Sequence, residues 1–567
     1  MASSKIPYIA LAIGFGFLGV FILYPIIFLL YGSFWSANPG FAGHFTLANY
    51  IKAFTANQTY VTLRNTIEYA LGSAILGVSL GTIISYILTR TDTPAKGFFH
   101  YAQYFPLALP AYVANLAWIN IFDARSGILN IWLHDLLGIA PFNIYSLAGM
   151  VWATGIGLTP LSYIIISPAM RSMNPALEES SKSSGASSVQ TFFRIVFPLV
   201  LPATLSAFIL NLALSVEAFE TSIQIGVLGG VKVFMSTIYY DVNANAHPAY
   251  NLAATYGAIL LILTSTLFYL YYRSLRSSSK YQVVTGRGYA SKVISIGKWK
   301  YATFAAMIIY FFVTVIAPFS VVVMVSLAPF WNPYAMFAHL SLKNYSYLFA
   351  PSTGIFSIIT RSVASSGVGA TVVSALALTI TFIVYRTKLR GRYNLERLGM
   401  LPLTIPSLLI GYGLLWAFLT IKTNLYGTIG VLIIAFSISY LPQGIRVMSG
   451  SIIQIHSDLE EASRVSGAGL FTTLRNIVLP LVRNSVIGGW IYVFIVSFKA
   501  VGSIVLLTTP QNQVFSTYVW ALYTSGSGSV ANGNLAAASV VLMIILWALI
   551  GGMLLVQRRV VAEQFVS

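Results

Sequence analysis

Paired glutamates occur in two stretches of the chain, each followed at a fixed spacing by a glycine and a proline. The first stretch reads LEESSKSSGASSVQTFFRIVFPL (residues 177–199), and the second, in the other half of the chain, reads LEEASRVSGAGLFTTLRNIVLPL (459–481). The matching acidic residues and glycines are Glu178, Glu179 and Gly185 in the first stretch and Glu460, Glu461 and Gly467 in the second. In a chain that is 57% hydrophobic and 8% charged, such acidic pairs project a polar surface that a partner can recognise.

Each stretch has the pattern of a helix that starts, breaks and starts again. Asn174 precedes a proline, which is a favourable N-cap, and Ser457 with Glu460 forms an S-x-x-E capping box. The acidic pair then lies near the first turn, where the helix dipole favours negative charge, and the glycine is placed to end the helix. We expect a second short helix that stops before the proline, so that residues 174–198 and 457–480 each form a helix-break-helix segment.

Three further charges, Glu217, Glu220 and Lys499, fall inside long apolar stretches. A charge at mid-membrane costs roughly 2.5–3.5 kcal/mol on insertion scales, so each needs an explanation. The two glutamates are three residues apart and are expected to share one helical face, and Lys499 follows Glu217 at the same offset that separates the two glutamate stretches. They could form an ion pair across two halves of the chain, line a cation path that Lys499 tunes, or lie hydrated at a membrane boundary.

Several kinds of chemistry are disfavoured by the residues that are missing. There is no cysteine, and no two of the six histidines have i,i+3 or i,i+4 spacing, so a metal site built by this chain is not expected. No catalytic Ser-His-acid arrangement stands out, and no G-x-x-x-x-G-K-[ST] loop is present to bind ATP. We therefore expect no catalytic, cofactor or metal site, and no enzyme activity. Nucleic-acid binding is also disfavoured, because the basic residues lack a recognition motif.

Composition indicates an integral membrane protein made of helices. A chain of 567 residues with mean hydropathy +0.79 cannot bury this much apolar surface in a soluble core. Its apolar runs have the roughly 20 residues that a membrane-spanning helix needs, about twice the length of a barrel strand. Twelve spans are predicted, near residues 7–31, 66–89, 102–122, 145–168, 199–225, 251–272, 301–326, 361–385, 398–420, 424–446, 481–507 and 534–556.

The basic residues predict the orientation of these spans, because positively charged loops stay in the cytoplasm. Residues 273–300 contain seven basic residues and no acidic one, whereas residues 508–533 carry no charge. This places both termini, the linker at 273–300 and both glutamate segments in the cytoplasm. A loop lying on the membrane surface is the alternative for one such segment, but two copies in register make it less favourable.

The two halves of the chain are repeats of one another. FTLANYIKAF (45–54) corresponds to LSLKNYSYLF (340–349), and FPLALP (105–110) corresponds to LPLTIP (401–406). We expect an all-α fold of two homologous six-helix halves, residues 1–272 and 301–567, that enter the membrane in the same sense. Such parallel repeats favour a substrate path between the halves.

The two glutamate segments resemble the EAA motif, E-A-A-x3-G-x9-I-x-L-P, of permease subunits in binding-protein-dependent ABC importers. In that family the first part of the motif forms a coupling helix that sits in a groove of the cytoplasmic ATPase. The resemblance implies that the six motif residues named above form two docking sites for a dimer of ABC ATPase subunits, which would hold ATP and Mg. It also implies an extracytoplasmic solute-binding protein, an inner-membrane location and transport by alternating access.

The segments after the motif resemble fused, double-length permeases of the ferric-iron type. They read EAFETSIQIGVLGGVKVFMSTIY (217–239) and FKAVGSIVLLTTPQNQVFSTYVWALY (498–523). The resemblance implies iron(III) as the solute. Fused permeases for thiamine and for 2-aminoethylphosphonate share the plan, and Ala500 stands where an acidic residue is expected in many iron-type permeases. An ion-coupled secondary transporter is the alternative of another class, but it leaves the duplicated docking segment without a role.

Overall fold

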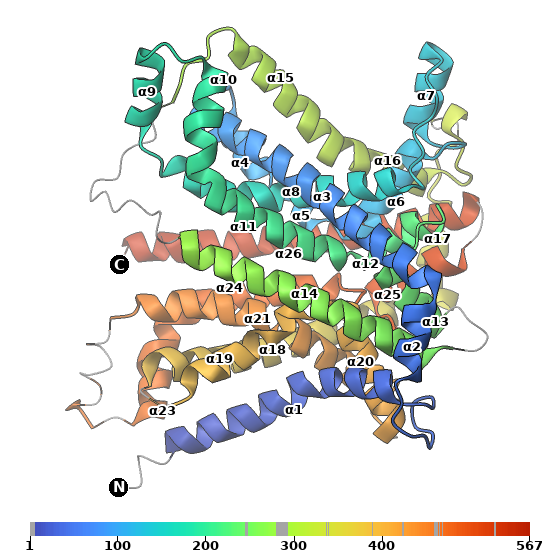
Figure 1. Cartoon of the computed structure of the whole chain (residues 1–567), viewed down its shortest axis with the longest axis vertical. Helices are drawn as coiled ribbons and strands as arrows, with labels where there is room; N and C mark the ends of the chain where they lie inside the picture. Colours follow the sequence, from blue (N-terminus) through green and yellow to red (C-terminus); the bar gives the residue numbers. More distant parts are fainter. Residues whose placement is uncertain are drawn as a thin grey trace. The chain divides into compact units, whose positions relative to one another are not determined.

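The fold is built from α-helices, as a computed structural model of the chain shows (Figure 1). The structure describes residues 6–566 except 244–247, 279–292, 336, 338, 388, 422–423, 457, 459–462, 464, 468 and 527–528. Within this described part, ten helices are long and apolar enough to cross a membrane, and two further pairs of helices pass the same test as bent spans. The prediction of twelve spans is thereby confirmed.

The spans of each repeat follow the same order along the chain. In the first repeat the helices of the spans are α1 (Ile6–Phe34), α3 (Asn57–Arg90), α4 to α6 (Lys96–Ala102, Phe105–Ala108 and Ala111–Phe122), α8 (Leu147–Arg171), α10 and α11 (Ser188–Thr191 and Phe197–Val216) and α14 (Tyr250–Ser278). In the second repeat they are α15 and α16 (Trp299–Phe311 and Ala317–Leu327), α18 (Ile355–Arg386), α19 and α20 (Arg392–Met400 and Ser407–Ile421), α21 (Ile429–Gln454), α23 and α24 (Leu470–Thr473 and Leu479–Phe498) and α26 (Ser529–Val566).

The two bent spans occupy the same place in each repeat. The chain turns by 101° before α6 and by 100° before α20. In both cases the residue that leaves the helical conformation, Leu109 (ψ 133°) or Ile405 (ψ 119°), directly precedes a proline. The proline ring clashes with a helical residue before it, so it forces this residue into an extended conformation.

The helices form two compact units that do not coincide with the sequence repeats. One unit comprises residues 1–53, 239–261 and 345–567, and the other comprises 54–238 and 262–344. The first span of each repeat therefore belongs to the unit that holds most of the other repeat. In the unit that contains residues 1–53, α1 packs against α18, α19, α20 and α21. In the unit that contains residues 54–238, α16 packs against α6.

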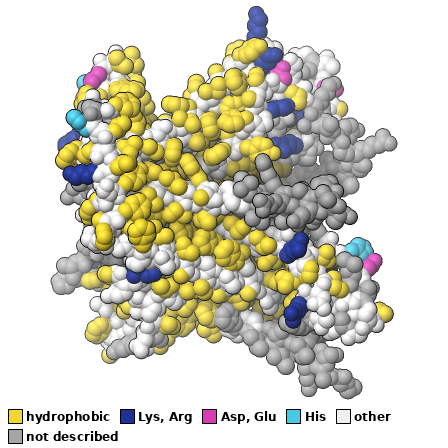
Figure 2. Space-filling view, turned by 180° about the vertical axis from the view of Figure 1, so that it is seen from behind, with side chains coloured by type: hydrophobic (Ala, Val, Ile, Leu, Met, Phe, Trp, Pro, Cys, Tyr) yellow, Lys and Arg dark blue, Asp and Glu magenta, His cyan; other side chains and the backbone are white. Residues whose placement is uncertain are grey.

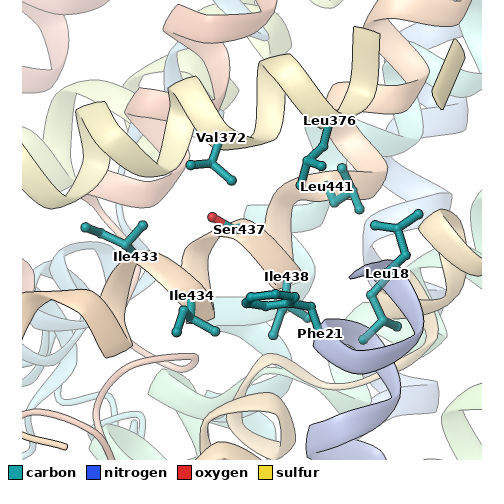
Figure 3. A pocket seen from close by; sticks show the side chains of 10 residues that line it. Leu18, Phe21, Val372, Leu376, Ile433, Ile434, Ser437, Ile438 and Leu441 are labelled. Atoms are coloured by element: carbon teal, nitrogen blue, oxygen red, sulfur yellow. The ribbon is translucent and has the colours of Figure 1, made fainter. Parts of the chain in front are cut away.

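Apolar side chains hold α1 in its unit. Leu18 and Ile22 are buried in a cluster that includes Leu395, Leu441 and Ile445. Between these helices lies an apolar pocket of about 200 Å³, lined by residues of α1, α18 and α21 (Figure 3). Ser437 adds to this lining a hydroxyl that has no hydrogen-bond partner among the described residues.

Three spans widen locally just before a proline and continue through it. A turn of π-helix precedes Pro198, Pro480 and Pro318, at Phe192–Val196, Leu474–Val478 and Phe312–Ile316. Wider i→i+5 hydrogen bonding removes the need for the missing proline N–H and makes room for its ring. The prediction that a second short helix stops before Pro198 and before Pro480 is therefore wrong, because residues 189–216 and 474–498 each form one continuous span.

The surface of the protein is largely apolar. Figure 2 shows hydrophobic side chains over much of the visible face, with few charged side chains among them. Large side chains such as Ile27, Ile75 and Ile262 are more than half exposed. Apolar surface of this extent matches the hydrocarbon core of a bilayer.

Candidate functional site: the coupling segments and the charges beyond the spans

The first glutamate segment forms α9 (Pro175–Ser183), a turn and α10. The Asn174 side chain accepts a hydrogen bond from the N–H of Ala176 at 3.0 Å, so the predicted N-cap is confirmed. The helix ends in a left-handed residue, Gly185, with φ +84°. The N–H of Ala186 donates to the carbonyl of Ser181 at 3.1 Å, which is the hydrogen bond typical of a helix closed by glycine.

The two adjacent glutamates of α9 point in different directions. Glu179 is exposed, whereas Glu178 is 2% exposed. Successive helical residues are about 100° apart, so one can face inward while the next faces outward. Both predicted coupling residues are thus on α9, but only Glu179 offers its carboxylate to the outside of the segment.

Glu178 forms a buried ion pair with Arg90, the last residue of α3. Its Oε1 lies 3.0 Å from Nε and 2.8 Å from Nη2 of Arg90, and the two side chains are 3% and 0% exposed. An arginine this deeply buried needs a carboxylate partner. Arg90 was not predicted as a site residue, because a single arginine at the end of an apolar run does not indicate a contact with a residue 88 positions later in the sequence.

A serine and a threonine join the two helices of the segment in both repeats. Ser181 and Thr191 share a hydrogen bond of 2.9 Å, and Ser463 and Thr473 share one of the same length. Each serine replaces an alanine that is usual in the EAA motif. These pairs were not predicted, although the sequence contains a signal for them, since both residues recur at the offset that relates the two glutamate segments.

The second glutamate segment is described in part. Ser457, Glu460 and Glu461 lie outside the described residues, so their predicted roles stay predictions. Gly467 has the same φ of +84° as its counterpart in the first repeat. Arg386, the last residue of α18, donates hydrogen bonds to the carbonyls of Ile452 and Ile455 at the end of α21.

The charges Glu217 and Lys499 occupy equivalent places, each directly after a span helix. Glu217 follows α11 and Lys499 follows α24, and both are half-buried. The span that ends at Val216 has 28 residues and begins at Val189, next to the first coupling segment. Glu217 therefore lies at the end of this span opposite the coupling segment.

Glu217 and Glu220 do not share one helical face. Ala218, between them, has a non-helical ψ of 85°, and Glu220 belongs to a separate short helix, α12 (Phe219–Thr221). The apolar sequence that continues to residue 225 predicted a longer helix, but hydropathy does not reveal a local break in the backbone. The irregular stretches that follow, 217–233 and 499–514, lead into α13 (Phe234–Asn243) and α25 (Phe515–Ser525).

The second span of each repeat holds the irregular stretch in the same way. The N–H of Phe234, at the start of α13, donates to the Thr66 hydroxyl of α3 at 3.1 Å. The N–H of Phe515, at the start of α25, donates to the Ser362 hydroxyl of α18 at 2.6 Å. Each hydroxyl satisfies a backbone N–H that a helix start leaves without a partner.

Buried polar side chains fix the irregular stretch of the first repeat. Asn115 of α6 donates to Thr221 at 3.2 Å and to Gln224 at 3.0 Å. Thr154 of α8 donates to Thr221 at 3.3 Å and shares a hydrogen bond of 2.6 Å with Tyr69 of α3. Four elements therefore meet in one network, in which paired groups are far less costly to bury than single ones.

The second repeat replaces this network by close backbone packing. Gly411, Phe436, Ser503 and Leu506 stand at the positions of Asn115, Thr154, Thr221 and Gln224. A Cβ atom added to Gly411 would lie 2.6 Å from the carbonyl oxygen of Ser503. Among the described residues, the four positions in the second repeat thus do not reproduce the side-chain network of the first, and the Ser503 hydroxyl has no hydrogen-bond partner there. Among the described residues no group of three His, Cys, Asp or Glu side chains could hold a metal ion.

Comparisons with known proteins identify relatives that match most of the chain. Residues 73–280 and 377–562, one range in each repeat, match the family described as binding-protein-dependent transport system inner membrane component. The ferric transport system permease protein FbpB of Actinobacillus pleuropneumoniae is 27% identical over 84% of this chain and 68% of that protein. The Fe(3+)-transport system permease protein FbpB 2 of Haemophilus influenzae is 28% identical over 81% of this chain and 83% of that protein. One chain in the crystal structure of a bacterial ABC transporter involved in alginate import is also similar. The match covers 49% of this chain and 96% of that chain, at 17% sequence identity and a TM-score of 0.39.

Proposed function

Because this chain belongs to the family of binding-protein-dependent transport system inner membrane components and is a permease of an ABC importer, we propose that two cytoplasmic ATPase subunits dock on α9 and on its counterpart at 457–480. ATP-driven closure of the ATPase dimer moves the two docked segments. This movement opens a solute path between the repeats alternately to the binding protein and to the cytoplasm. Both chain termini lie on the cytoplasmic side.

The duplicated geometry of the two segments carries this proposal. Each has a glycine at φ +84° and a serine–threonine hydrogen bond of 2.9 Å, at equivalent positions of the two repeats. A loop that only lies on the membrane surface has no reason to keep the same internal bonds twice. The outward face of α9, which includes Leu177 and Glu179, is exposed and offers an apolar and an acidic contact to a partner.

Charge reversal on the exposed faces tests the docking. We expect Glu179→Lys combined with Glu461→Lys to prevent co-purification of the ATPase subunits with this chain. Glu68→Lys is the matched control, because Glu68 is a partly exposed glutamate in the half of α3 that lies away from Arg90. If the native chain recruits no ATPase subunit, the importer mechanism is wrong and an ion-coupled transporter becomes the better explanation. If the double variant recruits the subunits as well as the native chain does, the docking site lies elsewhere.

The solute that we propose is iron(III). The support is the match to ferric permeases over more than four fifths of this chain. Glu217, Glu220 and Lys499 then lie at the entrance of the path, at the ends of spans that face the binding protein. The test is ATP hydrolysis by the reconstituted complex with binding protein loaded with ferric iron, thiamine or 2-aminoethylphosphonate. Stimulation by ferric iron alone supports the proposal, and stimulation by either of the others replaces iron with that solute.

A further inference from the structure

We propose that the ion pair between Arg90 and Glu178 passes the movement of the docked α9 to span α3, and through α3 to the irregular stretch 217–233. The inference rests on the proposed docking of an ATPase on α9. It assigns to Glu178 a role different from that of its neighbour Glu179. Glu179 faces the partner, whereas Glu178 connects the docked helix to the membrane span as a positioning residue.

At the end of α3 that includes Arg90, two contacts connect this span to α9 and to the start of the following span. Arg90 meets Glu178 through two nitrogen atoms, at 2.8 and 3.0 Å, with both side chains shielded from water. A second contact lies one helical turn earlier, where the ring of Tyr86 packs edge-on against Phe192 at 5.1 Å. Residues four apart lie on one face of a helix, so one face of α3 holds both α9 and the start of the following span.

The ion pair between Arg90 and Glu178 is difficult to break because it is buried. An ion pair in water exchanges its partners easily, but a buried pair that loses its partner leaves an uncompensated charge. Nη1 of Arg90 and Oε2 of Glu178 are buried and have no hydrogen-bond partner among the described residues. Within the described part of the chain no alternative partner is therefore in place for either atom, and α9 cannot shift away from α3 without exposing both charges or carrying Arg90 with it.

The half of α3 that lies away from Arg90 contacts the irregular stretch 217–233. α3 has 34 residues, which corresponds to a rod of about 51 Å. Near its far end the Thr66 hydroxyl accepts the N–H of Phe234 at the start of α13, and Tyr69 joins the polar network that holds the stretch 217–233. α3 also packs along α8 and against α11. One helix thus contacts the docking segment at one end and the irregular stretch at the other.

The experiment measures the movement of the far end directly. Spin labels attached after Val61→Cys and Ser357→Cys report the distance between the equivalent exposed ends of α3 and α18. The chain has no cysteine of its own, so only these two sites are labelled. With the ATPase subunits bound, adding ATP should change this distance in the otherwise native protein, and Glu178→Gln should reduce the change by roughly threefold or more. The same variant should still co-purify the ATPase, since Glu179 is intact.

Arg64→Gln is the matched control. Arg64 forms an ion pair with Glu68 on the same helix at 2.7 Å, but its side chain is 76% exposed, so its loss should leave the distance change as it is. A native distance change in Glu178→Gln would overturn the proposal, and so would loss of ATPase binding in a folded Glu178→Gln, which would make Glu178 a docking residue. If Glu178→Gln does not fold, Thr66→Val decides at the other end, where a reduced change supports the connection through α3 and a native change overturns it. Failure of the native chain to recruit any ATPase would refute the docking proposal instead and would be seen before the variants are compared.

Discussion

Replacing Gly185 by alanine should loosen α9 by an amount that its backbone conformation determines. At φ +84° an L-residue meets its own backbone, and a methyl group added there has no atom within 4 Å. The cost is therefore backbone strain alone, about 1–2 kcal/mol. Asparagine tolerates left-handed conformations better, so Gly185→Asn should cost less than Gly185→Ala.

Hydrogen exchange of the purified chain measures this loss locally. A fall of about 1–2 kcal/mol in the free energy of opening speeds amide exchange roughly 5- to 30-fold in peptides that cover α9. Gly467→Ala should produce the same factor in its own segment, because Gly467 has the same φ. Gly157→Ala is the control, since Gly157 lies within α8 with equally open space around it, and alanine there should slow exchange slightly. Unchanged exchange in α9 after Gly185→Ala would refute the reasoning.

Four further substitutions test other contacts. Ser181→Ala and Ser463→Ala should each destabilise their segment by about 0.5–1.5 kcal/mol through loss of one hydrogen bond, and hydrogen exchange that responds in only one segment would contradict their equivalence. Asn115→Ala should lower the unfolding free energy in detergent by about 2 kcal/mol, because buried polar partners lose their bonds; a change below about 0.5 kcal/mol would show that the network is not stabilising. Hydrogen bonds from the Ile296 N–H and a serine hydroxyl lower the pKa of the Asp92 carboxyl below its ordinary value of 3.8. The protection of the Ile296 amide against hydrogen exchange should therefore be full above about pH 4 and should fall as the pH drops further through the lowered pKa. Asp92→Ala should remove this protection at pH 7, and an amide that stays protected would contradict the assignment.

The spans were predictable because each depends on a local property, a run of about 20 apolar residues. The two bends were also within reach, since Pro110 and Pro406 interrupt the third and ninth spans. The different directions of Glu178 and Glu179 were not, because they depend on Arg90, which is distant in sequence. Hydropathy likewise missed the end of α11 at Val216, since apolar residues continue past the break.

The exchange of first spans between the compact units has a consequence for how the protein is made. α1 is synthesised before the second repeat, but its buried residues Leu18 and Ile22 pack against Ala377, Ile380 and Leu441, which belong to that repeat. At roughly 5–20 residues per second, the ribosome needs on the order of 20–70 s to produce these partners. During that time α1 resides in the bilayer without the helices that will bury it. Biogenesis of the chain therefore requires that α1 is stable in lipid by itself, and assembly of its unit can finish only after most of the second repeat has been inserted.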